Sequence, residues 1–501
     1  MSRIRLSVLA VASASAVVGT GIAAGSASAA TPPAPVAPTA TDSLSAPGAT
    51  VDAQGNLSAA PDVRATVAYN VAPGITTAGA PGSQLSAATI DCGNKLQGTL
   101  SLLPSSPSGA VSGSVVCTYP SVGTYTVKLT ATDNQTPGAT TVVTHTVTVA
   151  YPAKVAVDRY DGATRYGTGV ALSQAEFPTA GSAGAVVLAR GDVFADALAG
   201  IPLAKYKNAP LLLTPGGPTA TTLDKNVESE ILRVLPKDKS HTVFILGGTS
   251  AIPQAVADHI SSLGYNVVRL SGDSRYGTAL AIAQDPRALN NPATIVVARG
   301  DDFADALAAG PYASNIAADH GVPAAIVLSD GPSTTATLDP ATKAYVIDKL
   351  ASYQPANLIP TVTAIGGGAD TAVDNLQGVN KAGLNAIEGN DRYETAADVA
   401  ARGWGNGSII WSTTDGLASG SSFPDALTGG AFMAMKNGPL LLTNPATTLS
   451  GFSASVLHNR PLLAEISIFG GTSVLQPSLV TAVGQAVQPK PVVYTDHHLM
   501  Y

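Results

Sequence analysis

Arginine is the residue type that recurs at fixed places where this chain could bind a ligand. Arg165, Arg275 and Arg392 each stand three residues after a glycine and directly before a tyrosine. Arg190 and Arg299 recur at a second place, between a predicted strand and a predicted helix. Because a guanidinium donates two parallel hydrogen bonds to a phosphate or carboxylate, these five arginines predict the binding of an anionic ligand.

A structural role for the same arginines is the competing interpretation. A buried arginine is usually paired, so these side chains could form salt bridges with acidic residues of their own repeat, such as Asp196. The third copy of the motif also differs from the others, because the segment from Trp411 to Asp415 is expected at the place of Arg190 and Arg299. We therefore expect three unequal sites, with the third the weakest.

Aspartates and glycines recur beside the arginines and predict structural rather than catalytic roles. One aspartate of each repeat stands near a helix N-terminus, where the helix dipole favours a carboxylate. A Gly-Gly pair near the end of each repeat predicts a tight strand-to-helix turn, or alternatively backbone N–H groups that face a phosphate. These residues are Asp196, Asp305, Asp425, Gly247, Gly248, Gly366, Gly367, Gly470 and Gly471.

Catalytic and metal-binding motifs are missing from the sequence. We find no Gly-x-Ser-x-Gly elbow, no Walker loop, no His-Glu-x-x-His motif and no recurring pair of histidine and carboxylate. A non-enzyme that uses no cofactor and no metal is therefore expected. His145 lies on the apolar face of a predicted strand, where a hydrogen-bonded core histidine is the default expectation.

Composition limits the class of protein. The 501 residues predict three to five domains, and 45% hydrophobic with 12% charged residues is typical of neither a disordered chain nor a membrane bundle. The formal net charge of -7 argues against nucleic acid and against an acidic membrane surface as partners. No internal segment has the length and apolarity of a membrane span.

The first third of the chain divides into three predicted segments. Residues 1–29 have the basic start, apolar stretch and Ala-x-Ala site of a secretory signal peptide. Residues 30–61 are rich in Pro, Ala and Thr, which predicts a linker. Residues 62–150 alternate apolar and polar side chains, which predicts a small all-β sandwich. Cys92 and Cys117 lie in this region, and in an exported protein they predict a disulfide.

The remaining two thirds of the chain contain three copies of one unit, at residues 154–264, 265–384 and 385–487. Besides the arginine motif, each unit contains a Phe-x-Asp-Ala-Leu segment and a Gly-Gly pair at matching offsets. Short apolar runs such as 185–189 alternate with helical patterns, so each unit is predicted to be an α/β domain with a parallel sheet. A period of this length exceeds that of solenoid repeats and predicts that each unit is a domain in its own right.

These three motif sets, repeated in one order, resemble the cell wall binding repeat 2 family of Gram-positive surface proteins. The resemblance implies three Rossmann-like or toprim-like domains in a pseudo-threefold arrangement, which bind an anionic secondary wall polymer without a covalent bond. It also implicates the apolar triplet after the helix in polymer binding. The triplets here are Leu211, Leu212 and Leu213, then Ile326, Val327 and Leu328, and then Leu440, Leu441 and Leu442. Residues 123–133 of the β-sandwich resemble the polycystic-kidney-disease-type (PKD-like) immunoglobulin domains.

The sequence therefore predicts a secreted protein of the cell surface that is anchored to the wall and displays a β-sandwich. The expected partner is an anionic wall polysaccharide or a teichoic-type polymer, and other surface proteins are possible further partners. Two alternatives remain open. The chain could be a wall-remodelling hydrolase, or an adhesin whose β-sandwich binds a separate ligand.

Overall fold

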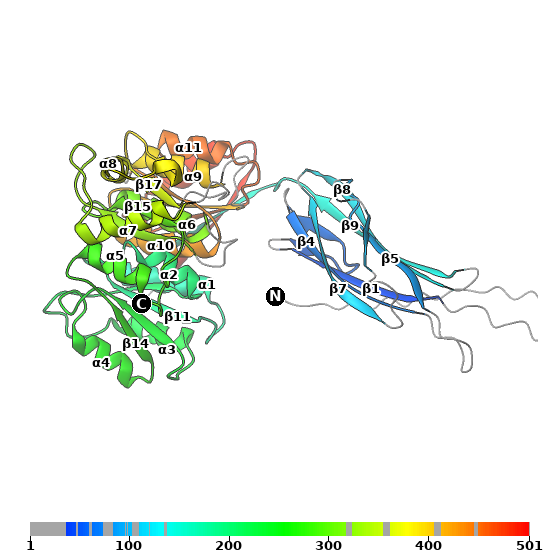
Figure 1. Cartoon of the computed structure of the whole chain (residues 1–501), viewed down its shortest axis with the longest axis horizontal. Helices are drawn as coiled ribbons and strands as arrows, with labels where there is room; N and C mark the ends of the chain where they lie inside the picture. Colours follow the sequence, from blue (N-terminus) through cyan, green and yellow to red (C-terminus); the bar gives the residue numbers. More distant parts are fainter. Residues whose placement is uncertain are drawn as a thin grey trace, which may run out of the picture. The chain divides into compact units, whose positions relative to one another are not determined.

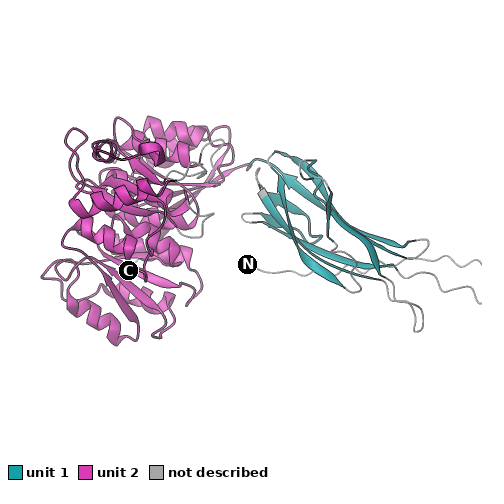
Figure 2. Cartoon of the chain, viewed as in Figure 1, with its two compact units in different colours: residues 1–151 teal, residues 152–501 magenta. Residues whose placement is uncertain are grey.

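The chain forms two compact units, residues 1–151 and 152–501, drawn in Figures 1 and 2. The computed structural model describes residues 37–499 apart from 47–48, 60–62, 74–83, 96, 98, 103–109, 120, 135–137, 317–322, 354–360, 405–411 and 445–448. The predicted signal peptide at 1–29 lies outside these residues. Among the helices described, none has the length and apolarity needed to cross a membrane.

The first unit contains two sheets that share one core. Within the described residues, one sheet has the order β1-β4-β7, formed by Thr39–Ser45, Val63–Ala72 and Val111–Tyr119. The other has the order β2-β3-β9-β8-β5-β6, formed by Thr50–Val51, Leu57–Ala59, Thr140–Val149, Gly123–Asp133, Leu85–Asp91 and Thr99–Ser101. Val127 and Leu129 are buried while Lys128 between them is exposed, which is the predicted alternation.

The predicted linker at 30–61 is partly wrong, because β1, β2 and β3 lie within it. Strand β1 pairs antiparallel with β4 along its whole length, and β3 pairs with β9. Ala40, Leu44 and Leu57 point into the core. Apolar residues are sparse in this segment, so its composition resembles that of a linker although a few buried side chains attach it to both sheets.

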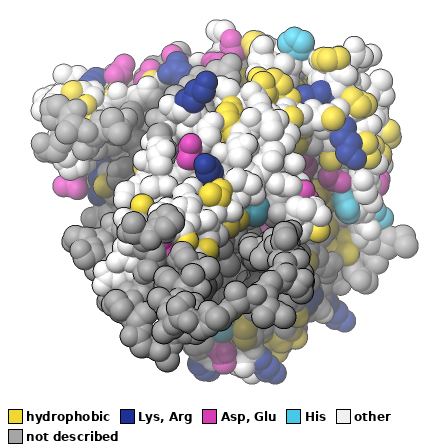
Figure 3. Space-filling view, turned by 90° about the vertical axis from the view of Figure 1, so that its right-hand side faces the viewer, with side chains coloured by type: hydrophobic (Ala, Val, Ile, Leu, Met, Phe, Trp, Pro, Cys, Tyr) yellow, Lys and Arg dark blue, Asp and Glu magenta, His cyan; other side chains and the backbone are white. Residues whose placement is uncertain are grey.

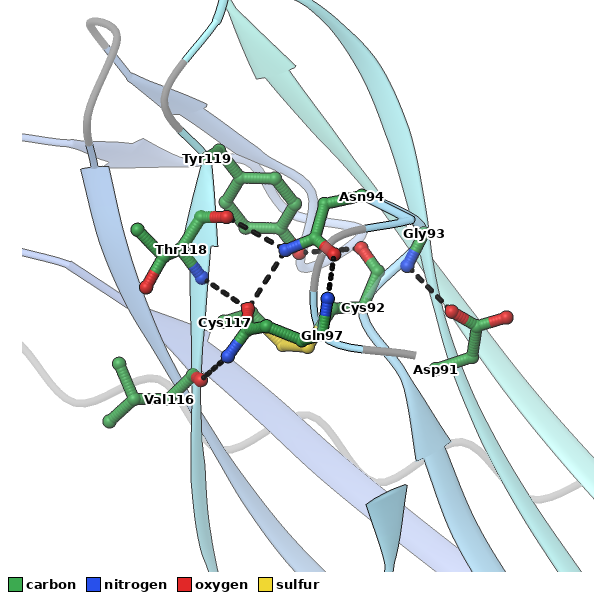
Figure 4. The surroundings of a disulfide bond; sticks show 9 residues. All are labelled: Asp91, Cys92, Gly93, Asn94, Gln97, Val116, Cys117, Thr118 and Tyr119. Atoms are coloured by element: carbon green, nitrogen blue, oxygen red, sulfur yellow. Dashed lines mark hydrogen bonds between the residues drawn. A yellow bond between two sulfur atoms is a disulfide. The ribbon is translucent and has the colours of Figure 1, made fainter. Parts of the chain in front are cut away.

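The predicted disulfide between Cys92 and Cys117 is present, and Figure 4 shows its surroundings. Cys92 directly follows β5 and Cys117 lies in β7, so the bond joins the two sheets. Both cysteines are fully buried. Beside the bond, the hydroxyl of Tyr119 donates to the carbonyl of Cys92 at 3.0 Å, and the Gln97 amide oxygen accepts from the Thr118 N–H at 2.7 Å.

His145 is a buried histidine with two polar partners. Its Nε2 lies 2.7 Å from Asp42 Oδ1 on β1, and its Nδ1 lies 3.2 Å from the carbonyl oxygen of Gln54. Both partners are acceptors, so the ring satisfies them together only when both nitrogens are protonated. The hydrogen bond to Asp42 raises the pKa of His145. The imidazolium therefore ties β1 and the turn at Gln54 to strand β9.

The second unit contains three parallel sheets. The first has the order β12-β11-β13-β14, formed by Leu211–Thr214, Ala185–Arg190, Thr242–Leu246 and Asn266–Leu270. The second has the order β16-β15-β17-β18, formed by Ala325–Ser329, Ile295–Arg299, Val362–Ile365 and Leu384–Ile387. The third has the order β20-β19-β21-β10-β22, formed by Leu440–Thr443, Thr414–Ser419, Glu465–Phe469, Val155–Gly162 and Val492–Leu499.

Each of these sheets includes a strand from another repeat. Strand β14, at the start of the second predicted repeat, completes the first sheet, and β18, at the start of the third, completes the second. Strand β10, at the start of the first repeat, pairs with β21 in the sheet of the last. The repeats are thus not separate domains as predicted. They form a closed series of three sheets, which we call the ring.

Helices cover the sheets of the ring and pack on one another in its middle. Helix α2 (Gly200–Tyr206), α6 (Ala304–Ile316) and α10 (Phe423–Met435) touch pairwise, and Figure 1 shows them close together. Gly310 of α6 and Gly430 of α10 both lie against Ile201 of α2, where an added Cβ would clash with its side chain. The remaining helices are α1 (Arg165–Glu176), α3 (Lys225–Val234), α4 (Gln254–Ser262), α5 (Arg275–Gln284), α7 (Pro340–Ala351), α8 (Gly367–Asp374), η2 (Lys381–Gly383), α9 (Arg392–Trp404), α11 (Gly451–His458) and α12 (Ser478–Ala486).

We predict that the stability of the first unit falls as the pH rises. The pKa of a histidine in an unfolded chain is about 6.5, and the folded pKa of His145 is higher. The contribution of His145 to stability is therefore complete below about pH 6.5 and is lost as the pH rises through the folded pKa. Hydrogen exchange of β1 and β9 in the full chain, expressed as protection factors, measures this loss. His145→Gln should flatten the profile, whereas the control His259→Gln in the other unit should not. An unchanged profile in His145→Gln would contradict the assignment.

Candidate functional site

Three phenylalanines meet where the repeats of the ring come together. Phe194, Phe303 and Phe423 occupy the same place in the three Phe-x-Asp-Ala-Leu segments, each four residues after the end of a strand. Their ring centroids are 5.5, 5.6 and 6.0 Å apart. All three side chains are partly exposed. The three repeats therefore contribute equally to one aromatic surface, which we call the phenylalanine cluster.

The three motif arginines are held in the same way in their repeats. Each begins a helix, namely α1, α5 or α9, and its Nη1 donates to the carbonyl of a glycine that directly follows a strand. The acceptors are Gly191, Gly300 and Gly420, at 2.7, 2.6 and 2.7 Å from Arg165, Arg275 and Arg392. This bond uses Nη1 of each guanidinium and leaves the Nε and Nη2 donors for other partners.

The arginines also reach across the boundaries between repeats. The guanidinium carbon of Arg275 lies 5.4 Å from the centroid of the Phe194 ring, and that of Arg392 lies 5.4 Å from Phe303. Both distances are within the range of a cation–π contact. Arg392 Nη2 additionally donates to Asp302 at 3.1 Å. Among the described residues, Arg165 and Arg275 have no carboxylate partner.

Arg190 and Arg299 have a different environment, because a nearby carboxylate neutralises each of them. Arg190 donates from Nε and Nη2 to Asp192 at 2.6 Å each, and Arg299 makes the same two bonds to Asp301 at 2.7 and 2.6 Å. These hydrogen bonds raise the pKa of both arginines and lower the pKa of both aspartates. The expected salt bridge with an acidic residue is present for these two arginines, but the partner is the aspartate two residues later in the chain rather than Asp196.

The third repeat departs from the other two at a place that differs from the predicted one. In register with the neighbouring edge strand, Ser419 ends β19 as Arg190 ends β11 and Arg299 ends β15. The predicted counterpart at 411–415 is therefore wrong. Asp415 instead lies fully buried inside β19, 3.1 Å from Arg460. The sequence pattern is misleading at this place because Asp415 puts a charged side chain inside a buried strand.

The three recurrent aspartates face the Gly-Gly turns. Gly247, Gly366 and Gly470 have positive φ angles of 95°, 85° and 107°. A Cβ at Gly247 or Gly470 would lie 2.5 or 2.6 Å from a carboxylate oxygen of Asp196 or Asp425, and one at Gly366 would also meet Asp305. Backbone conformation and close packing thus explain the first glycine of each pair. Of the second ones, Gly248 and Gly471 follow in the same turns, and Gly367 is the first residue of helix α8.

The aspartates also join neighbouring repeats. Thr278, in the arginine motif of the second repeat, donates its hydroxyl to Asp196 Oδ1 of the first at 2.7 Å. A hydrogen bond from Thr168 of the first repeat lowers the pKa of Asp425 in the last, although burial, the larger effect, raises it. Burial raises the pKa of Asp305 to about 6. The aspartates therefore lie at the junctions of the ring.

The apolar triplets offer no surface to a ligand. Residues 211–213, 326–328 and 440–442 lie in β12, β16 and β20, and all nine side chains are at most 3% exposed. Direct contact between these side chains and a polymer is therefore excluded in this structure, and their role is in the core. The phenylalanine cluster was missed from the sequence, although Phe recurs in the same segment as the predicted aspartates.

Two further observations concern the metal-ligand and charged side chains of the described residues. No group of three or more His, Cys, Asp or Glu side chains among them could hold a metal ion. On the face drawn in Figure 3, the described Lys and Arg side chains are scattered among acidic ones. Arg275 and Arg392 beside the phenylalanine cluster form a local group of cations suited to an anionic ligand.

Comparison with known families finds a match over the three repeats. The family described as cell wall binding domain 2 (CWB2) matches residues 159–257, 269–372 and 386–480. These segments together make up more than half of the chain, and they correspond to the three repeats of the ring.

Individual proteins are similar over the same large part of the chain. An N-acetylmuramoyl-L-alanine amidase, LytC, of Bacillus subtilis (strain 168) is 31% identical over 339 residues, which are 67% of this chain and 59% of LytC. The amidase enhancer of that organism is 30% identical over 286 residues, 57% of this chain and 34% of the relative. The chain thus spans less than two thirds of either relative.

Two solved structures from Clostridium difficile share the fold. Cwp8 has a TM-score of 0.51 at 21% identity, covering 72% of this chain and 59% of its own. Cwp6 has a TM-score of 0.56 at 19% identity, covering 91% of this chain and 69% of its own.

Loss of the hydroxyl that bonds Asp196 should weaken the ring. Thr278→Val keeps the shape of the side chain but leaves a carboxylate oxygen without its donor, so we predict a loss of about 1–2 kcal/mol in the free energy of unfolding. Urea unfolding followed by tryptophan fluorescence reports on the ring, since both tryptophans belong to the second unit. The exposed Thr222→Val is the matched control. Equal unfolding midpoints for the two variants would show that the junction bond contributes nothing.

Proposed function

Because the chain belongs to the cell wall binding domain 2 (CWB2) family, we propose that it is a secreted surface protein held non-covalently on a Gram-positive cell wall. Its ligand on the wall is an anionic secondary polymer, either a polysaccharide or a teichoic-type polymer. Its location is the cell surface, to which the predicted signal peptide at 1–29 directs it. The three matched segments support this role, since each of them is a cell wall binding domain.

The observation that carries the proposal is the arrangement of Arg165, Arg275 and Arg392 around the phenylalanine cluster. The side chains of Arg165 and Arg275 have donors left after their bonds to glycine carbonyls, and no described carboxylate takes them. A phosphate or carboxylate of the polymer would accept these donors. The partly exposed phenylalanine rings would pack against the apolar faces of its sugars.

The geometry also supports a pseudo-threefold arrangement of Rossmann-like or toprim-like repeats. The same arginine-to-carbonyl bond occurs in all three, and each contributes one ring to the phenylalanine cluster. Ligands of open parallel sheets bind outside the carboxyl ends of the strands, which is where these arginines lie. The sites are unequal in this proposal, because Asp302 partly neutralises Arg392 and Ser419 replaces an arginine in the third repeat.

We propose binding rather than catalysis, and an immunoglobulin-like role for the first unit as a displayed spacer. The match to cell wall binding domains supports the first point. The two sheets joined by a buried disulfide support the second, since such sandwiches serve as rigid spacers in surface proteins. Other surface proteins are the candidate partners of this unit.

The anchoring role predicts that neutral substitutions at two arginines release the protein from walls. In the variant Arg165→Gln/Arg275→Gln, the polymer loses charged hydrogen bonds of about 1.5 kcal/mol or more each, so affinity should fall about tenfold per site. Co-sedimentation of the full secreted chain with cell walls of the producing bacterium measures it. The control is Arg287→Gln, an exposed arginine paired with Asp285 outside the cluster.

Two outcomes would contradict this proposal. Undiminished sedimentation of the double variant, with an unchanged circular dichroism spectrum, would remove the arginines from the site. Binding that persists after mild acid has stripped the secondary polymers would identify peptidoglycan as the ligand. Binding that disappears with the polymers supports the anchoring role.

A further inference from the structure

Among the described strands, the third sheet of the ring has one, β22, that has no counterpart in the other two sheets. Strand β22 pairs in parallel with the outer side of β10, from Val155 opposite Val492 to Gly162 opposite Leu499. The Nε of Arg159 on β10 donates to the hydroxyl of Tyr494 on β22 at 3.2 Å. The ring nitrogens of His497 and His498 on β22 lie 3.1 and 3.0 Å from carboxylate oxygens of Asp158 and Asp161. The C-terminal segment thus covers the edge of this sheet.

The first sheet ends at an equivalent strand, β14, and no described strand pairs with its outer side. The equivalence follows from the Gly-Gly turns, since the Gly247 N–H donates to the carbonyl of Leu270 as the Gly470 N–H donates to that of Tyr160. Arg269 therefore matches Arg159. Its Nη1 donates to the Gly247 carbonyl at 2.9 Å, as Nη1 of Arg159 donates to that of Gly470 at 2.7 Å.

The two arginines differ in what covers them. Arg159 is completely buried beneath β22, whereas Arg269 is partly exposed. The Nη2 of both arginines is buried without a hydrogen-bond partner, so the difference lies at Nε: that of Arg159 donates to Tyr494, and no described residue accepts from that of Arg269. The position that Tyr494 fills on the third sheet is therefore open on the first.

The outer side of β14 also has the backbone groups and the space that a further strand needs. Asn266 donates its N–H inward to the carbonyl of His241, so by alternation the N–H and C=O groups of Val267 and Arg269 point outward. A groove of about 310 Å³ runs between this edge and helix α4. Lys239 lines it together with Arg269, and Asp258 is the acidic residue among the lining side chains.

The corresponding edge of the second sheet is closed by a side chain. There Arg402 of α9 donates from Nη1 to the carbonyl of Ala386 on β18 at 2.9 Å. Ala386 stands where Arg159 and Arg269 stand in the other sheets, so this edge lacks the arginine as well. The edge of β14 is thus distinct from both of its counterparts.

We propose that the edge of β14 binds an extended segment of a partner protein as an additional parallel strand. The segment places a tyrosine hydroxyl or a carboxylate opposite Arg269, whose unused donors would bond it. Main-chain hydrogen bonds to Val267 and Arg269 supply affinity, as in other cases of strand addition to an open sheet edge. The positive charges of Lys239 and Arg269 favour an acidic segment over a basic one.

The test uses the chain's own strand as the probe. A fluorescently labelled synthetic peptide of residues 490–499 is titrated into the full chain, and fluorescence anisotropy is recorded. We expect saturable binding that falls about tenfold or more in Val267→Pro, which removes the outward N–H at an edge position where proline is tolerated. The matched control Val267→Thr keeps that N–H and should bind the peptide normally.

A second comparison leaves the protein unchanged. The Pro491 carbonyl accepts from Val155, so by alternation the N–H of Thr495 faces the neighbouring strand and that of Tyr494 faces away. A peptide N-methylated at Thr495 should bind about tenfold weaker, and one N-methylated at Tyr494 should bind like the unmodified peptide. Absence of binding would overturn the proposal. Binding that Val267→Pro leaves intact would also overturn it, since the peptide would then be exchanging with β22 at β10.

Discussion

The exchange of strands between repeats determines where the rest of the second unit lies. The strand at the edge of a parallel sheet has a row of N–H and C=O groups that need hydrogen-bond partners. In each sheet of the ring, the first strand of another repeat supplies such partners. Each exchanged strand leads directly into the helix that starts with a motif arginine. The strand therefore brings that arginine to the boundary between two repeats, where Arg275 and Arg392 lie beside a phenylalanine of the preceding repeat.

Local features of the fold were predictable because their causes are local. The runs at 211–213 and 185–189 are strands since continuous apolar residues suit a sheet covered on both faces. The Gly-Gly turns follow from a backbone conformation that glycine adopts freely. The disulfide followed from two cysteines in one β region. The strands and turns are each signalled by a few consecutive residues, and the disulfide by two cysteines 25 residues apart.

Features that depend on distant partners could not be read in this way. Strand β22 is exposed on nearly every residue, so its sequence lacks the alternation that identifies a half-buried strand. In the sequence, strand β10 has the position of the first strand of a separate domain. Its pairing with β21 arises only because the last repeat closes the ring. The phenylalanine cluster joins residues that lie over a hundred positions apart in sequence. The candidate site was therefore predictable as a set of arginines but not as an arrangement around aromatic rings.

Closure of the ring by β10 has a mechanical consequence. The first unit ends at residue 151 and β10 begins at Val155, so tension on the first unit enters the ring at the amino end of this strand. Strand β10 is hydrogen-bonded to parallel neighbours on both sides, β21 and β22. A pull along the strand loads both ladders in shear, so their bonds must break together rather than one after another. The segment that joins the two units is thus anchored at a point of the ring that resists being peeled away.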